Sequence, residues 1–124
     1  MMLKSPKNQI RISKNFLLSE FQCPCCRRVM VDFRLLDLLE SLRRRIGDKP
    51  VLVNSGYRCE EYNRKVGGVP RSYHLLGMAA DVRVPGVEPK VLIKHAFDVG
   101  FLGLGLYATF CHLDIRSHYT RWKG

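Results

Sequence analysis

Two stretches of the chain carry apolar side chains at the spacing of an amphipathic helix. In the first, Asp32 is suited to cap the start of the helix and Gly47 to end it. The second covers residues 88–99, and Gly100 is suited to stop it. We expect both apolar faces to pack into a core. They consist of Leu35, Leu38, Leu39, Leu42 and Ile46 in the first helix and Val91, Leu92, Ala96 and Val99 in the second, whereas Arg34, Glu40, Arg43 and Arg44 lie mostly outside.

Residues 110–116 alternate between apolar and polar side chains, which is the period of a half-buried strand. Polar side chains therefore share one face, and apolar side chains share the other. The polar face holds His112, Asp114 and Arg116, and the apolar face holds Cys111, Leu113 and Ile115.

Shorter patterns predict further strands at residues 51–54, 79–84 and 104–107 and a short helix at residues 59–66. The last of these strands is expected to form a hairpin with the strand that follows it. Helices and short strands in this order indicate an α+β fold with a small, mainly antiparallel sheet and packed helices. We expect one domain over residues 16–124, preceded by a basic and loosely held arm at residues 1–15.

The length of 124 residues suits one compact core, and no apolar run approaches the ~20 residues of a membrane span. The formal net charge of +10 favours polyanionic partners such as an acidic cell wall. We do not expect a nucleic-acid partner, because the sequence shows neither a basic, aromatic face nor a complete cysteine zinc site. We expect a monomer.

Residues 1–9 are polar and basic, and no apolar stretch follows them. This pattern is not that of a secretory signal, so we expect synthesis in the cytoplasm. Action on a cell wall would then require release or delivery by another system.

Five cysteines, an odd number, argue against a complete disulfide framework. Cys23 and Cys26 have the C-x-x-C spacing of half a structural zinc site, but the sequence has no second such pair. The sequence leaves open whether Cys23, Cys25, Cys26 and Cys59 form a disulfide, a second metal site or simply buried apolar residues.

His74 and Asp81 are the leading candidates for metal ligands, since imidazole and carboxylate both suit a borderline-soft ion such as zinc. His112 is the natural third ligand, with Asp114 two residues further along the same strand face. Three protein ligands leave a fourth position for water, as in catalytic zinc sites. Asp114 is then the candidate base that takes a proton from this water.

The chain resembles the zinc D-alanyl-D-alanine carboxypeptidases and related peptidoglycan peptidases, which share their fold with the hedgehog signalling domain. Ser-x-His-(x6)-Asp from Ser72 to Asp81, followed by His-x-Asp at His112, carries the resemblance. Supporting motifs in the same order are Ser55-Gly56-Tyr57-Arg58-Cys59, Tyr62-Asn63, Val66-Gly67-Gly68 and Gly103-Leu104-Gly105-Leu106-Tyr107.

The resemblance implies one catalytic Zn2+ and hydrolysis of peptidoglycan peptides. It also implies that Arg58, in a loop aimed at the metal, holds a substrate carboxylate or the developing oxyanion. A structural ion pair is the alternative for Arg58. Ser72 is expected to orient substrate or to stiffen its loop. Tyr57 and Tyr107 are expected to line the cleft, with burial in the core as the alternative.

The sequence departs from the family at one position. Many members have an acidic residue three positions before the last histidine ligand, where this chain has Thr109. Other members have His-x-His in place of His112-x-Asp114, and there the second histidine binds the metal. This comparison leaves the third ligand open between His112 and Asp114, with His112 favoured because neutral imidazole suits zinc.

The function expected is therefore a zinc metallopeptidase that acts as a carboxypeptidase or endopeptidase on peptidoglycan stem peptides or cross-links. The alternative is a non-catalytic, zinc-containing module of the same fold that binds cell wall or a protein partner. Thr109 motivates the alternative, because threonine cannot serve as the acidic base.

Overall fold

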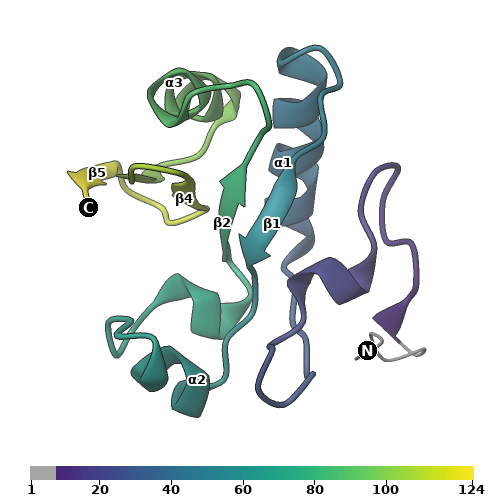
Figure 1. The fold of residues 1–124 in the computed structure, drawn as a ribbon, viewed down its shortest axis with the longest axis vertical. Helices are drawn as coiled ribbons and strands as arrows, with labels where there is room; N and C mark the ends of the chain where they lie inside the picture. The colour runs from purple at the N-terminus through teal and green to yellow at the C-terminus, as the bar shows by residue number, and fades with distance from the viewer. Residues whose placement is uncertain (1–7) are drawn as a thin grey trace.

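The computed structural model describes residues 8–124, which form an α+β fold around one five-stranded sheet (Figure 1). The strand order is β1-β2-β4-β3-β5, and every neighbouring pair is antiparallel except β3 and β5. The strands are β1 (Leu52–Ser55), β2 (Ala79–Arg83), β3 (Gly103–Leu106), β4 (Cys111–Asp114) and β5 (Thr120–Lys123). The sheet therefore confirms the predicted fold class.

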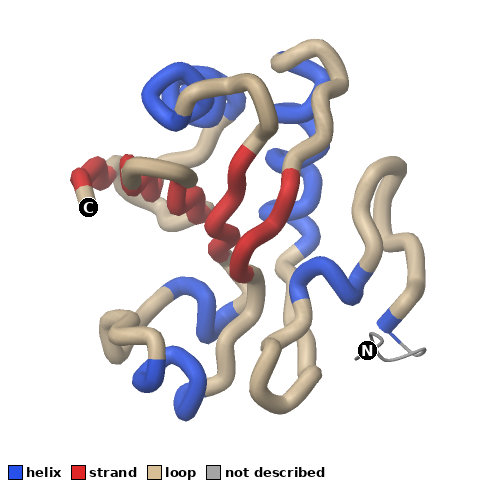
Figure 2. Tube along the Cα trace, in the orientation of Figure 1, coloured by secondary structure: helices blue, strands red, loops and turns tan. Residues whose placement is uncertain are grey.

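The helices of the described residues are α1 (Phe33–Arg45), α2 (Glu60–Lys65) and α3 (Pro89–Val99), with 3-10 turns η2 (Leu18–Phe21) and η3 (Tyr73–Leu76). In Figure 2, the segment between η2 and α1 is loop, and so is much of the segment between β1 and β2. All three helices were predicted to within one or two residues. Within residues 8–124, no helix combines the length and the apolar content that crossing a membrane requires.

The hydrophobic core lies between one face of the sheet and the pair α1 and α3, which contact each other. Leu39 and Leu42 from α1 are fully buried there, as are Ile93 from α3 and Leu113 from β4. The predicted leucine face of α1 is confirmed, although Leu38 is only partly buried. For α3, the prediction for Val91 is wrong, because the side chain is 42% exposed.

The prediction that Glu40 lies outside the buried face of α1 is also wrong. Its carboxylate is buried and accepts hydrogen bonds from the Ser13 hydroxyl and from the backbone and side-chain N–H groups of Asn15. These bonds compensate for the loss of hydration of a buried charge. They also tie residues 13–15 to the domain, whereas the sequence predicted that these residues belong to a loosely held arm. Residues 1–7 of that arm lie outside the described residues, and its boundary stays a prediction.

One strand was not predicted from the sequence. Residues 120–123 form β5, which pairs in parallel with β3 along the edge of the sheet. Thr120 and Trp122 alternate with the charged residues Arg121 and Lys123, a four-residue signal that the sequence prediction missed. Pairing with β3 holds the strand, which brings Trp122 to the sheet edge.

Candidate metal centre

His74 is held in one orientation by the turn that carries it. The Ser72 hydroxyl caps η3 by accepting a hydrogen bond from the His74 N–H at 3.1 Å, and Gly77 ends the turn with a φ of 68°. The imidazole is buried, and its Nδ1 lies 2.6 Å from the carbonyl oxygen of Gly56. Because a carbonyl oxygen can only accept, Nδ1 carries the proton and Nε2 keeps its lone pair free.

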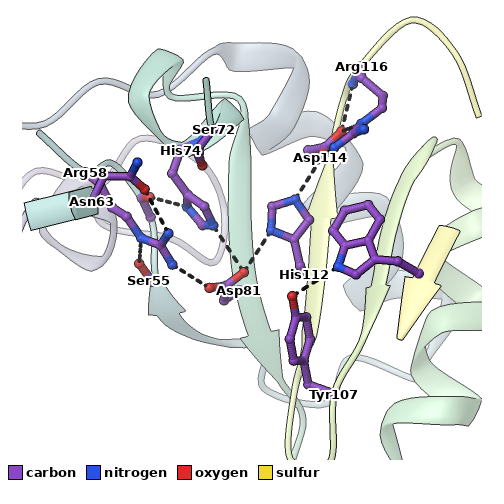
Figure 3. Close-up of polar contacts among 12 residues, drawn as sticks. Ser55, Arg58, Asn63, Ser72, His74, Asp81, Tyr107, His112, Asp114 and Arg116 are labelled. Carbon is purple, nitrogen blue, oxygen red and sulfur yellow. Dashed lines mark hydrogen bonds and ion pairs between the residues drawn. The ribbon is translucent and has the colours of Figure 1, made fainter. Parts of the chain in front are cut away.

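The pairing of β2 with β4 places Asp81 directly opposite His112. Oδ1 of Asp81 lies 3.1 Å from Nε2 of His74 and 3.0 Å from Nδ1 of His112, so the carboxylate stands between the two rings (Figure 3). One ligand atom from each of the three residues lies within 4.8 Å of the others. The structure therefore brings together the three residues that the sequence singled out as metal ligands.

Asp114 contacts the other side of the His112 ring. Its Oδ2 lies 2.7 Å from Nε2 of His112, and the Arg116 guanidinium donates to both carboxylate oxygens at 2.8 and 2.7 Å (Figure 3). The carboxylate is 0% exposed. Asp114 thus accepts the Nε2–H of His112 and leaves Nδ1 facing Asp81, as carboxylates beside metal-binding histidines commonly do.

This geometry does not support the predicted role of Asp114 as a base. A base must reach the water whose proton it takes. Both oxygens of the Asp114 carboxylate are engaged in hydrogen bonds with His112 and Arg116, on the side of the His112 ring that faces away from Asp81. The alternation of residues correctly placed Asp114 on the same strand face as His112. Periodicity could not show which way its side chain would turn.

Arg58 fixes the outer oxygen of Asp81. Its Nη2 donates to Oδ2 of Asp81 at 3.0 Å, while Nε donates to Ser55 and Nη1 to Asn63. The guanidinium has five N–H groups, so these three bonds leave donors for an oxygen in the cleft that Arg58 lines. The ion pair that we considered as an alternative is thus present, and it leaves room for contact with a substrate.

Aromatic side chains form the wall of the cleft opposite Arg58. Tyr107 stacks on Phe110 with ring centroids 4.5 Å apart, and its hydroxyl accepts a hydrogen bond from the Trp122 indole at 3.0 Å. The Trp122 ring lies 5.1 Å from the His112 ring. Tyr107 lines the cleft as expected, and so does Ser72, whose hydroxyl caps η3. Sequence reasoning missed Trp122 because it missed β5, although a lone tryptophan in a basic tail was a usable signal.

The charged groups of the cluster shift one another's pKa values. Burial acts to raise the pKa of Asp81, but the hydrogen bonds that His112 and His74 donate when their rings are protonated outweigh it and lower that pKa well below its usual range. Burial acts to lower the pKa of His112, but hydrogen bonds from its protonated ring to Asp114 and Asp81 raise it. Asp81 is therefore ionised at neutral pH, as a metal-binding carboxylate must be.

The donor set fits zinc. Two imidazole nitrogens and one carboxylate oxygen are ligands that catalytic zinc sites use, with a fourth position for water. Each imidazole also has an acceptor on its other nitrogen, Gly56 for His74 and Asp114 for His112. Such partners fix the tautomer and orientation of metal-binding histidines.

Comparison with known proteins points to one family. The model of the family described as Peptidase M15 matches residues 14–114. The zinc D-Ala-D-Ala carboxypeptidase of Streptomyces albus G is 46% identical over 44 residues, which cover 36% of this chain and 17% of that protein. The peptidoglycan L,D-endopeptidase MepK of Escherichia coli (strain K12) is 33% identical over 92 residues, which cover 68% of this chain and 50% of that protein. The chain thus spans half the length of these curated relatives or less.

Proposed function

Because this chain belongs to the peptidase M15 family, we propose that it is a zinc-dependent peptidase that hydrolyses peptidoglycan stem peptides or cross-links. Nε2 of His74, Nδ1 of His112 and Oδ1 of Asp81 would hold one catalytic zinc ion. The observation that carries the proposal is the convergence of these three atoms at the wall of a cleft. The basic chain would favour approach to a polyanionic cell wall.

A bound zinc ion would supply a nucleophile at neutral pH by lowering the pKa of a coordinated water to about 7. Arg58 would bind a substrate carboxylate or the oxyanion that develops at the scissile carbonyl, using N–H groups beyond those that hold Asp81. The same guanidinium keeps Asp81 turned toward the two histidines. Arg58 thus links substrate binding to the orientation of a metal ligand.

We assign Asp114 as a positioning residue rather than as the base predicted from the sequence. It holds the Nε2–H of His112, and Arg116 in turn holds Asp114. On the opposite wall, Tyr107 and Trp122 would contact the substrate through their rings. Ser72 would act through His74, because its hydroxyl caps the turn on which His74 lies.

The test is to incubate the zinc-loaded protein with purified peptidoglycan and to identify new peptide ends by mass spectrometry. We expect cleavage by the wild-type protein, and none by His74→Ala or after zinc is removed with a chelator. His95→Ala is the matched control, since His95 lies on α3 and contacts Arg45 rather than the cleft. Cleavage that survives in His74→Ala would overturn the proposal.

A non-catalytic binding module of the same fold is the second candidate function. Two observations favour it. Thr109 stands at the position where many family members have an acidic residue, and the Asp114 carboxylate is bound by the Arg116 guanidinium. Zinc-dependent binding to intact cell wall without any new peptide ends would support this function over the first.

A further inference from the structure

A second cluster of possible metal ligands lies apart from the histidines. Cys23 and Cys26 belong to the loop that follows η2, and Cys59 immediately precedes α2. Their sulfur atoms all lie within 4.8 Å of one another. The other two cysteines are elsewhere: Cys25 is exposed, and the Cys111 thiol is buried against the carbonyl of Pro89.

The spacing of the sulfur atoms suits a shared metal ion. Sγ of Cys23 lies 3.7 Å from Sγ of Cys59, far longer than the ~2.05 Å of a disulfide bond. With Zn–S bonds of ~2.3 Å in a tetrahedral site, two ligand sulfurs lie about 3.8 Å apart. The thiols are therefore separated as they would be if both bound one zinc ion.

The local backbone presents the three sulfurs to one point. The Cys23–Cys26 turn is closed by hydrogen bonds from Arg27 N–H to the Cys23 carbonyl and from Cys23 N–H to the Arg28 carbonyl, both 2.8 Å. The backbone N–H of Tyr62 donates to Sγ of Cys59 at 3.4 Å.

We propose that Cys23, Cys26 and Cys59 bind a second zinc ion. Three thiolates are soft ligands that suit zinc, and Cys23 and Cys26 have the C-x-x-C spacing common in structural zinc sites. The site is distinct from the His74 cluster and shares no ligand with it.

The position of this site gives the ion a structural role. Cys59 follows Arg58, and Gly56 supplies the carbonyl that orients His74. The loop side of the site is already joined to this segment, because the Tyr57 N–H donates to the Phe21 carbonyl at 2.8 Å. A zinc ion bound by Cys23 and Cys59 would fasten the two segments together and so steady both groups that support the histidine cluster. This last step rests on the proposed function, whereas the binding of the ion does not.

The experiment is to measure metal content of the zinc-saturated, reduced protein and to repeat the measurement with cobalt. We expect two zinc ions per wild-type chain and a near-ultraviolet thiolate-to-cobalt charge-transfer band. Cys26→Ser should lose one ion and the band. Cys25→Ser, the matched control one residue away, should keep both ions and the band. His74→Ala should lose one ion but keep the band, so failure of the catalytic site is distinguishable from failure of this one.

Thiol labelling of the wild-type protein provides a readout that does not depend on the folding of a variant. Zinc should protect Cys26 from alkylation while Cys25 reacts, and removal of zinc by a strong chelator should make Cys26 reactive. Three results would overturn the proposal: no charge-transfer band in the wild-type protein, loss of the band in Cys25→Ser, or a Cys23–Cys59 disulfide in the freshly purified, zinc-saturated protein.

Discussion

The two faces of the same strands differ sharply. On the core face, Leu113 of β4 lies between Ala80 of β2 and Leu104 of β3, and all three are fully buried. On the cleft face, the next position along each strand brings His112 between Asp81 and Gly105. One residue of register therefore separates a hydrophobic core from a cluster of ionisable ligands.

The comparison also shows what the cleft face requires from its neighbours. On β3, the residues opposite His112 and Asp114 are glycines. A Cβ atom on Gly103 would collide with the Asp114 carboxylate, and one on Gly105 would lie 2.6 Å from the Trp122 ring. The core face is stabilised by side chains that fill space. On the cleft face, β3 must lack side chains at residues 103 and 105 so that the polar groups of β4 and the Trp122 ring can fit.

The largest effect is expected on the cleft face. Asp81→Ala should lose zinc and lower the peptidase activity by more than about 1,000-fold, because the nucleophile at neutral pH depends on the ion. Metal analysis and cleavage of peptidoglycan peptides measure the two losses. Arg83→Ala is the control, because Arg83 is charged, lies on the same strand and is exposed at its end. Retention of a full equivalent of zinc at the histidine cluster of Asp81→Ala would show that the carboxylate is not a ligand.

The core face should respond in the opposite way. Leu113→Ala removes a fully buried side chain and should lower the free energy of unfolding by about 2–5 kcal/mol. Urea unfolding measures this loss, and activity per folded molecule should stay close to that of the wild-type protein. If that activity instead fell as far as in Asp81→Ala, the two faces could not be treated as independent.

The sequence was a good guide to elements whose signal is local. The leucines of α1 repeat at helical spacing, and β4 alternates, so both were predicted from their own residues. The same alternation placed His112 and Asp114 on one face. The convergence with His74 and Asp81 was predicted with the help of the resemblance to the zinc peptidases, whose motifs occur in the same order in this chain.

Features that depend on distant contacts could not be predicted in this way. β5 has only a four-residue alternation of its own, and its parallel pairing with β3 holds it in the sheet. Glu40 looks like a surface residue of α1, and its burial is explained by the Ser13 and Asn15 groups that meet it. The contact that fixes the Asp114 rotamer is local, with Arg116 two residues away, but alternation predicts only the face on which a side chain lies and not its direction there.

A smaller effect is expected at Asp114, which contacts His112 on the side of the ring away from the other ligands. Asp114→Asn removes the anionic acceptor of the His112 Nε2–H and should weaken zinc binding about 10–100-fold. A competition titration with a chelator of known affinity measures this change. Asp98→Asn is the control, because Asp98 forms an exposed ion pair with Arg45. Unchanged zinc affinity in Asp114→Asn would show that His112 is held by other contacts.

The same variant has a distinct acid response. Burial acts to raise the pKa of Asp114, but hydrogen bonds from Arg116 and His112 outweigh it and lower the value to about 2. A lowered carboxyl pKa contributes stability above the unfolded value of about 3.9 and loses it as the pH falls toward 2. The metal-free wild-type protein should therefore lose more unfolding free energy between about pH 4 and pH 2 than metal-free Asp114→Asn. Parallel curves for the two proteins would contradict this assignment.

The smallest effect is expected at the aromatic wall, where the cleft face ends at β5. Trp122→Phe keeps a ring beside His112 but removes the hydrogen bond to the Tyr107 hydroxyl. Since one such bond contributes about 1 kcal/mol, KM for a peptidoglycan peptide should rise about 5-fold with little change in kcat. Tyr119→Phe is the control, because Tyr119 is exposed and its ring contacts Phe97. A fall in kcat without a change in KM would mean that Trp122 acts on His112 rather than on the substrate, so this split decides whether β5 belongs to the binding wall or to the metal centre.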